Sequence, residues 1–270
     1  MTQTVQSWET SQMAAFNVED LLRPDVYEME EYAPIEPFEV LSARLGLSAE
    51  RIIKLDGNEN PYGPSPQALA ALADYRRYHI YPDPEHTLLR EAVQDYIGID
   101  KAHIMFGSGS DELIDLIMRL FLRAGDAIVN CPPTFGMYSF DAAICGAQVV
   151  RVPRRADFSL DMEVIRRQVL GHPTTRPSDH PTKKLLFVNS PNNPDGSVTS
   201  REDILRLLEL PLVAVIDEAY AEFSGTSVVD LVPAHSNLIV LRTFSKWAGL
   251  AGLRIGYGVF PLGIIRHLWK

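Results

Sequence analysis

One lysine in this chain stands where its side chain could act as a nucleophile. Lys246 follows the apolar run Asn237–Leu241 and precedes a stretch rich in Gly and Ala that ends at Arg254. An amine at the end of a buried strand can lose its proton and attack a carbonyl carbon. Thr243, Ser245 and Arg254 are suitable partners for a phosphate group beside it. A surface lysine that simply follows a strand is the alternative, and this segment alone does not separate the two.

The elements that must position this lysine alternate between helix and strand from Ser65 onward. Apolar spacing predicts helices over 66–78, 87–96, 113–121 and 135–145, and strands over 103–106, 127–130, 148–152, 185–188, 212–216 and 238–241. Most of these strands are continuous apolar runs, which indicates a parallel sheet covered on both faces. We therefore expect an α/β fold with three α-β-α layers and a mostly parallel central sheet.

The segments outside this alternation are mostly polar. Residues 1–30 are expected to be a mobile acidic lead-in, and the proline-punctuated segment 32–37 is expected to be extended. A short helix is predicted over 40–46, followed by a strand over 52–55 that enters an Asn-, Gly- and Pro-rich loop. Such a loop is rigid and often functional, although a plain surface turn has the same composition. The segment 171–182 is predicted to be a loop insertion.

Ligands of open α/β sheets bind beyond the carboxyl ends of the strands, so the residues at those ends carry the chemistry. The first such turn is Gly107–Glu112, which opens a helix. Its glycines let the backbone approach an anion, and its free N–H groups favour a phosphate. The turn has neither the third glycine of a dinucleotide fingerprint nor the Gly-Lys-Ser/Thr of a P-loop. Ser110 and Asp111 could instead only cap the helix.

Further strand ends carry groups that suit a flat heteroaromatic ring. Phe135 could stack on such a ring, although a lone Phe more often packs in the core. An amide in the turn 189–196 could bond a ring hydroxyl. Asp217 ends an apolar run, where an unpaired carboxylate is costly; a pyridinium N–H would be a suitable partner, unless the residue caps a helix. Tyr220 could donate a hydrogen bond to a phenolic oxygen of the ring.

Together these groups fit pyridoxal phosphate (PLP). They supply a phosphate cradle, a stacking aromatic, an amide, a carboxylate, a tyrosine, and a lysine amine for the aldehyde. Each is a moderate signal by itself. Their occurrence in separate strand-end loops of one sheet favours this cofactor over a chance assembly.

The composition argues against several classes of partner. The net charge is −10 over 270 residues, which disfavours nucleic acid and anionic membranes because both need a basic surface. A small phosphorylated ligand remains compatible with it. Cys131 and Cys145 have no metal-ligand spacing and indicate no disulfide framework, so we expect reduced thiols, no metal site and a cytoplasmic protein. The sequence lacks the apolar core of a signal peptide, the composition of a transit peptide, and a run that could span a membrane.

The sequence resembles the class I/II aminotransferases of PLP fold type I, and within them the histidinol-phosphate aminotransferases. The resemblance runs from about Tyr32 to the end of the chain. It rests on the segments Asn58–Gly63, Gly109–Glu112, Thr134–Tyr138, Asn192–Gly196 and Asp217–Tyr220, and on Ser245 and Lys246 with Arg254. Asp195 departs from the Thr that the family usually has before this glycine, and it lies beside the contact residue.

The resemblance implies a role for each of these positions. Lys246 would form a Schiff base with PLP and shuttle the proton, and Asp217 would pair with the pyridine nitrogen. Phe135 would stack on the ring, while Asn193 and Tyr220 would bond the ring oxygen. The phosphate would be held by Gly109, by the backbone at Ser110 and Asp111, and by Thr243, Ser245 and Arg254.

The resemblance also implies a homodimer with shared sites. Tyr62 would reach the PLP phosphate of the neighbouring subunit, while Tyr32 and Asn58 would lie on the substrate side. Residues 1–50 would be the N-terminal arm and the start of a small domain, 51–260 the PLP-binding large domain, and 261–270 the start of an interdomain helix.

The family continues beyond this point through a C-terminal small domain, which also supplies the arginine for the substrate α-carboxylate. We therefore expect the small domain to be largely absent and turnover to be weak. We also expect an exposed apolar patch at Ile264, Ile265, Leu268 and Trp269, which lie at helical spacing.

The expected function is a ping-pong amino transfer between glutamate and imidazole-acetol phosphate, the histidinol-phosphate transaminase reaction of histidine biosynthesis. The partners are then small amino donors and acceptors, one of them phosphorylated. Two alternatives use the same scaffold: an aromatic amino-acid transaminase, and a threonine-phosphate decarboxylase, which would lose CO2 instead of transferring nitrogen. A chain that binds PLP without turnover is a third.

Overall fold

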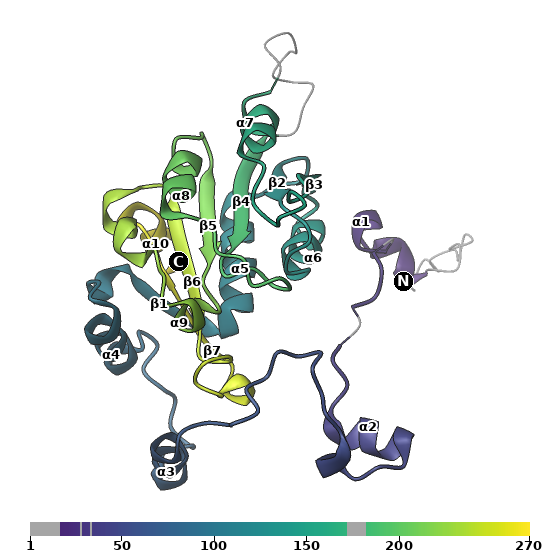
Figure 1. The fold of residues 1–270 in the computed structure, drawn as a ribbon, viewed down its shortest axis with the longest axis vertical. Coiled ribbons are helices and arrows are strands. Elements are labelled where there is room, and N and C mark those ends of the chain that lie inside the picture. The colour runs from purple at the N-terminus through teal and green to yellow at the C-terminus, as the bar shows by residue number, and fades with distance from the viewer. Residues whose placement is uncertain (1–16, 28, 33, 172–181) are drawn as a thin grey trace, which may run out of the picture.

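The apolar runs of the sequence form one seven-stranded sheet (Figure 1). The structure is a computed structural model, and it describes residues 17–27, 29–32, 34–171 and 182–270. The strands, in chain order, are β1 (Ile104–Ser108), β2 (Ala127–Asn130), β3 (Gln148–Arg151), β4 (Lys183–Asn189), β5 (Val213–Asp217), β6 (Leu238–Thr243) and β7 (Ile255–Val259). Their order across the sheet is β1-β7-β6-β5-β4-β2-β3. Among the strands of the described residues, β7 alone is reversed, since it pairs antiparallel with both β6 and β1 while the other pairings are parallel.

Helices precede or follow most of the strands. They are α1 (Pro24–Tyr27), α2 (Phe38–Leu45), α3 (Pro66–Asp74), α4 (Thr87–Ile97), α5 (Gly109–Phe121), α6 (Met137–Ile144), α7 (Met162–Leu170), α8 (Arg201–Leu208), α9 (Ala221–Ser224) and α10 (Leu262–Leu268). Local signals set several of their ends. The side chains of Ser65, Asp161 and Ser200 accept a first-turn N–H of α3, α7 and α8. Gly46 and Gly98 end α2 and α4 in the left-handed conformation.

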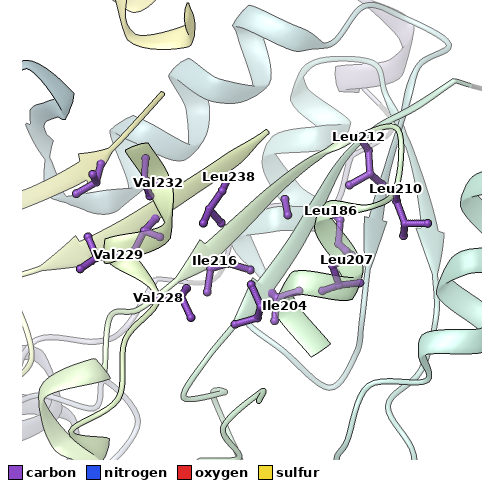
Figure 2. Close-up of a cluster of buried hydrophobic side chains, with 14 of the residues drawn as sticks. Leu186, Ile204, Leu207, Leu210, Leu212, Ile216, Val228, Val229, Val232 and Leu238 are labelled. Atoms are coloured by element: carbon purple, nitrogen blue, oxygen red, sulfur yellow. The ribbon is translucent and has the colours of Figure 1, made fainter. Parts of the chain in front are cut away.

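Successive residues of each central strand enter two different cores. In β4 and β5, Leu186 and Ile216 belong to one cluster, while Phe187 and Val215 belong to the other. Figure 2 shows the first cluster, in which side chains of α8 and of the segment 228–232 close over the strands. The second cluster contains side chains of α5, α6 and α10. Both faces of the sheet are therefore covered, which confirms the predicted three-layer fold and explains why the strands are apolar throughout.

The prediction missed β7, whose glycines weaken the strand signal. Gly256 faces the first turn of α5, where a Cβ would overlap the backbone of Gly109 and Ser110. This glycine lets the N-terminus of α5 lie directly against the sheet. The sequence signal for a strand was lost at the position where the site needs close backbone approach.

Two predicted elements are different in the structure. The strand over 52–55 does not form, and Ile53 and Leu55 are exposed with no strand pairing among the described residues. The helix from Pro66 ends at Asp74 instead of Tyr78, since Tyr75 has an extended backbone; the Tyr78 hydroxyl donates to the carbonyl of Leu72 at 3.0 Å. The other predicted elements are present with their ends moved by a few residues.

The expectation of an apolar patch near the end of the chain is wrong for α10. Ile264 and Ile265 are buried against α5, and Leu268 packs at the edge of the same cluster. The Trp269 ring lies under the guanidinium of Arg90, whose carbon is 5.4 Å from the ring centroid.

Two predicted segments fall partly outside the described residues. Of the acidic lead-in, 17–27 form short helical turns, and 1–16 are not described. Of the loop insertion over 171–182, residues 172–181 are not described. Within the parts of the chain that are described, none of the helices combines the length and apolar character needed to cross a bilayer.

The two-core packing predicts a sharp contrast within α8. Leu207 is fully buried, whereas Leu205, on the same helix, is 38% exposed. We expect Leu207→Ala to lower the free energy of unfolding by about 2–5 kcal/mol, because it leaves a cavity under the sheet. The matched control Leu205→Ala should cost less than about 1 kcal/mol. Urea denaturation followed by circular dichroism measures both, and equal losses would contradict this packing.

Candidate active site

A cavity of about 470 Å³ opens where the loops after β4, β5 and β6 meet the N-terminus of α5. These three strands are neighbours in the sheet and parallel, so their carboxyl ends meet at one edge (Figure 1). The predicted site residues that line the cavity are Tyr32, Asn58, Ser110, Asp111, Phe135, Asn193, Asp217, Tyr220, Thr243, Ser245, Lys246 and Arg254. Gly109 is one residue from the lining, and Tyr62 lies elsewhere.

Lys246 projects from the loop after β6 and is half-buried. Its Nζ donates a hydrogen bond to the carbonyl oxygen of Gly57 at 2.9 Å and lies 5.9 Å from the ring centroid of Tyr220. Desolvation lowers the pKa of this amine from its ordinary value of 10.5. A larger fraction of the amine is therefore neutral near pH 7 than for an exposed lysine, which is what a nucleophile requires.

The loop that carries Lys246 is fixed by short-range contacts. The Thr243 hydroxyl donates to the Ser245 hydroxyl at 2.9 Å and accepts the Ser245 N–H at 3.1 Å. Gly249, with φ of +68°, leaves room for the carbonyl of Gly63, where a Cβ would overlap it. The segment 57–63 therefore packs directly on the lysine loop, although the two are far apart in the sequence.

Asp217 ends β5 and is only 3% exposed. Its Oδ2 accepts a hydrogen bond from the Tyr138 hydroxyl at 2.6 Å, and its Oδ1 accepts one from the backbone N–H of Ala219 at 3.1 Å. Burial raises the pKa of this carboxyl to about 6, and these two hydrogen bonds oppose that rise. The group is a buried carboxylate with no cation bonded to it among the described residues, which suits a cationic N–H of a ligand.

The N-terminus of α5 forms the opposite wall of the cavity. Ser110 and Asp111 lie in its first turn, where backbone N–H groups have no partner within the helix. Gly109 N–H donates to the carbonyl of Arg254 at 2.8 Å, and the Arg254 guanidinium pairs with Asp111 at 2.8 Å. An arginine therefore stands at a helix N-terminus, which is a suitable arrangement for a phosphate.

The remaining predicted residues surround the space between these groups. Phe135 packs edge-on against Tyr138, with ring centroids 5.5 Å apart and planes at 81°. The Asn58 amide donates to the Tyr220 hydroxyl at 3.0 Å, so the two are a pair instead of separate contacts. Tyr32 lies 5.8 Å from the ring of Phe140.

Tyr62 is not brought into this cavity. It is 95% exposed and lines an adjacent cavity of about 550 Å³ together with Pro61, Pro191, Pro194 and Phe223. Asn58, Glu59, Asn193, Tyr220 and Lys246 line both cavities. Tyr62 therefore approaches Lys246 only from the side of the second cavity.

Two residues that position the site were not assigned roles from the sequence. Tyr138 closes on Asp217 from α6, and Asn189 donates to the backbone carbonyl of Asp217 at 3.0 Å while accepting the N–H of Asn193 at 2.6 Å. Both lie in segments that the strand-end reasoning had singled out. Nothing in the sequence indicates that Tyr138 and Asn189 contact Asp217, because the contacts join residues that are far apart along the chain.

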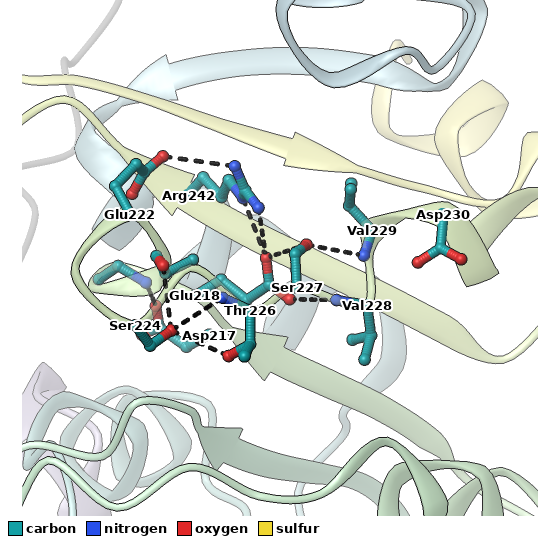
Figure 3. A network of polar contacts seen from close by, with 12 residues as sticks. Asp217, Glu218, Glu222, Ser224, Thr226, Ser227, Val228, Val229, Asp230 and Arg242 are labelled. Carbon is teal, nitrogen blue, oxygen red and sulfur yellow. Dashed lines mark hydrogen bonds and ion pairs between the residues drawn. The ribbon is translucent and has the colours of Figure 1, made fainter.

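A second carboxylate, Glu218, is buried next to Asp217 but is fully paired (Figure 3). Its side chain accepts hydrogen bonds from Arg242 Nε at 2.9 Å, the Ser227 hydroxyl at 2.7 Å and the Val228 N–H at 2.7 Å. It also forms an ion pair with Arg242 Nη2 at 2.9 Å. Removing one partner of such a pair typically costs about 3–5 kcal/mol, since the other charge stays buried. This ion pair fixes the backbone that carries Asp217 and Tyr220.

The described residues contain no group of three or more His, Cys, Asp or Glu side chains arranged to hold a metal ion. What the cavity offers is an amine whose pKa is lowered by burial, a buried carboxylate, an aromatic face and a helix N-terminus that could hold an anion. A sequence model of the class I and II aminotransferases matches residues 50–270. The chain belongs to this family.

Individual relatives within this family are more similar to the chain and share a more specific description. The histidinol-phosphate aminotransferase of Roseiflexus castenholzii is 56% identical over 259 residues, which cover 94% of this chain and 67% of that protein. The chloroplastic histidinol-phosphate aminotransferase of Nicotiana tabacum is 52% identical over 263 residues, with 97% and 62% covered. The crystal structure of histidinol-phosphate aminotransferase from Sinorhizobium meliloti in complex with pyridoxal 5'-phosphate matches with a TM-score of 0.78 at 28% identity. That alignment covers 96% of this chain and 67% of that one, so the chain spans about two thirds of the length of its relatives.

The buried carboxylate makes the stability of the ligand-free aminotransferase chain depend on pH. The pKa of Asp217 is about 6 in the folded protein and ordinarily 3.8. A raised carboxyl pKa stabilises the fold below the unfolded value, and this stabilisation is lost as the pH rises through about 6. We expect the free energy of unfolding of Asp217→Asn, relative to wild type, to rise by up to about 3 kcal/mol between pH 4 and pH 7.5. Urea denaturation at each pH measures it.

The matched control for this prediction is Asp230→Asn. Asp230 pairs with Arg201 at the surface, and this contact lowers the pKa of its carboxyl. Its removal should therefore change stability by less than about 1 kcal/mol and in the opposite direction with pH. If the difference between Asp217→Asn and wild type did not vary between pH 4 and 7.5, the burial of this charge would not be a cost to the fold.

Proposed function

We propose that this chain binds PLP covalently at Lys246 and takes part in amino transfer between histidinol phosphate and 2-oxoglutarate. The observation that carries the proposal is that the Lys246 amine and the Asp217 carboxylate share one cavity, with a helix N-terminus and an arginine at its wall. A ring with an aldehyde, a basic nitrogen and a phosphate needs these groups together. The substrate pair is supported by the two relatives at 56% and 52% identity, both histidinol-phosphate aminotransferases.

The residues present fit the cofactor. The Asp217 carboxylate has two hydrogen bonds from protein and free lone pairs on the cavity side, so it can accept a further N–H. Phe135 presents an aromatic ring to the cavity, and Asn193 and Tyr220 present an amide and a hydroxyl. Gly109, Ser110, Asp111, Thr243, Ser245 and Arg254 would hold the phosphate.

Bound PLP supplies an electron sink that lets the amino group of a substrate exchange through its aldehyde carbon. The chain's own residues do the rest. Asp217 would hold the pyridine nitrogen protonated, which strengthens the sink. Lys246 Nζ would be the base that moves the proton at the substrate carbon. Tyr32 and Asn58 lie at the cavity wall where the substrate would enter.

We propose residues 51–260 as the cofactor-binding unit of the chain. The whole sheet, from Ile104 to Val259, falls within it. Residues 1–50 would be an arm and the start of a second unit, and α10 would begin the segment that links them. A cytoplasmic location completes the proposal; it is supported by two free cysteines, of which Cys131 is buried with a pKa raised by burial to about 12.

The covalent site can be mapped directly. Protein incubated with PLP should absorb in the visible, and borohydride reduction followed by peptide mass spectrometry should place the cofactor on Lys246. We expect Lys246→Ala to lose the adduct completely. Lys184→Ala is the matched control. Lys184 lies away from the cavity, where its Nζ is 2.7 Å from Asp126 Oδ2, so this variant should not affect the adduct. An adduct on Lys54, Lys183 or Lys184 in the wild type would refute the assignment.

The substrate assignment is tested in single half-reactions of the PLP-loaded protein. Histidinol phosphate and glutamate should each convert the bound cofactor to its amine form, whereas phenylalanine should react slowly. Release of CO2 from threonine phosphate would instead indicate a decarboxylase.

We also propose that the chain forms a homodimer with shared sites. Tyr62 is 95% exposed and lines the second cavity together with Phe223, which is 66% exposed. A second subunit packed there would cover them, and Tyr62 would then reach the partner's phosphate site.

We predict that Tyr62→Phe weakens PLP binding about 10–150-fold, which corresponds to the loss of one hydrogen bond to a charged acceptor. Mixing Lys246→Ala chains with Tyr62→Phe chains should restore wild-type affinity at some sites, because one site of the mixed dimer then has both residues. Tyr81→Phe, at another exposed tyrosine, is the control and should have no effect. A monomer in sedimentation experiments that binds PLP as tightly as expected for the dimer would contradict the shared site.

A further inference from the structure

Tyr138 touches two of the residues assigned to the cofactor. It is fully buried in α6, on the face of the sheet covered by α5, α6 and α10. Its hydroxyl is 2.6 Å from Oδ2 of Asp217, and its ring lies edge-on to Phe135 at 5.5 Å. The ring also stacks on Phe187 of β4, with centroids 4.8 Å apart and planes at 19°. The side chain is therefore held by the sheet on one side and contacts two cavity residues on the other.

The phenol can only act as a donor in this arrangement. Burial raises the pKa of Tyr138 well above its ordinary value of 10, so the hydroxyl keeps its proton at any physiological pH. A neutral phenol donates a strong hydrogen bond to an ionised carboxylate. The bond is weaker when the carboxyl is protonated, because a neutral carboxyl is a poorer acceptor. The hydrogen bond therefore favours the charged form of Asp217.

We propose that Tyr138 is a positioning residue of the active site, which holds the Asp217 carboxylate ionised and oriented toward the cavity through its hydroxyl and supports Phe135 through its ring. This inference rests on the proposed function, in which Asp217 binds the pyridine nitrogen of PLP. Asp217 is buried beside other acids, and such a carboxyl would otherwise take up a proton near neutral pH. A protonated Asp217 could not keep the pyridine nitrogen charged.

Other charged groups around Asp217 also affect how easily its carboxyl ionises. Two acids, one from α5 and one that follows Asp217, disfavour its ionisation, and the lysine of the cavity favours it. A second tyrosine also lies within electrostatic range of the carboxylate. These groups are Asp111, Glu218, Lys246 and Tyr220. Glu218 is neutralised by Arg242, and Asp111 by Arg254, so the direct hydrogen bond from Tyr138 is the short contact that acts on Oδ2.

The test titrates Asp217 in the ligand-free protein. Aspartate labelled with 13C at the carboxyl carbon gives a resonance for Asp217, which is assigned by its absence in Asp217→Asn. Wild type should titrate with a midpoint near 6. In Tyr138→Phe the midpoint should rise by about one to two pH units, since the lost hydrogen bond had a charged acceptor. A midpoint that stays within about 0.3 units of wild type would overturn the proposal.

Two variants guard this measurement. Tyr257→Phe removes the hydroxyl of an equally buried tyrosine in the other core and should leave the Asp217 midpoint unchanged. If Tyr138→Phe does not fold, 3-fluorotyrosine at position 138 keeps the ring and makes the hydroxyl a stronger donor. It should lower the midpoint, and an unchanged or raised midpoint would overturn the proposal.

A cofactor-loaded experiment separates this inference from the proposed function. In Tyr138→Phe, borohydride should still fix PLP on Lys246, while the half-reaction with glutamate should slow about 10-fold or more at pH 7. The rate should recover toward wild type as the pH rises above the new midpoint, where Asp217 is ionised again. A loss of rate that does not depend on pH would overturn the positioning role. If wild type formed no PLP adduct, the proposed function would fail, whereas the titration of Asp217 would still decide whether Tyr138 controls its charge.

Discussion

The central constraint of this structure is the burial of two adjacent carboxylates at the end of β5. Asp217 and Glu218 are 3% and 2% exposed; Asp217 is the last residue of β5, the strand at the middle of the sheet, and Glu218 follows it. Two neighbouring buried charges are costly, so each must be compensated in its own way. Glu218 is neutralised by Arg242 from the adjacent strand and accepts two further hydrogen bonds, from Ser227 and Val228. From the described residues, the Asp217 carboxylate accepts only the Tyr138 hydroxyl and one backbone N–H. The fold thereby pairs Glu218 with a cation and leaves Asp217 without one. The Asp217 carboxylate can therefore bind a cationic ligand.

The other parts of the site depend on elements being able to approach this carboxylate closely. Parallel neighbours β4 and β6 bring the Asn193 turn and the Lys246 loop to the same edge. Gly256 lets the N-terminus of α5 lie on β7, which places the first backbone N–H groups of this helix at the far wall of the cavity. On the open side, the segment 57–60 closes the cavity through the Gly57 carbonyl on Lys246 and the Asn58 amide on Tyr220. The cavity is thus built by backbone approach as much as by side chains.

The burial of these charged groups lowers the stability of the ligand-free fold and at the same time prepares the site for a ligand. An unpaired buried carboxylate destabilises the ligand-free fold at neutral pH, and a ligand that supplies the missing N–H would recover that free energy as binding. The lysine is in a comparable state, because desolvation lowers the pKa of its amine. Burial therefore prepares both groups for a ligand before it arrives, which is how preorganised sites act.

The sequence by itself determined the layers of the fold and the residue types at the strand ends. Continuous apolar runs between turn signals indicate strands covered on both faces, and the chemistry expected of Lys246, Asp217 and Arg254 follows from their positions just beyond such runs. Tertiary structure decided the rest. It put Tyr138 on Asp217 across 79 residues, formed β7 through glycines that carry little strand signal, and buried Ile264 and Ile265 of α10 against α5. It also kept Tyr62 out of the cavity of its own chain. Local patterns report the environment of each residue along its own element. Which side chains meet across elements depends on strand order and on how closely backbones can pack, and a single sequence contains no local signal for either.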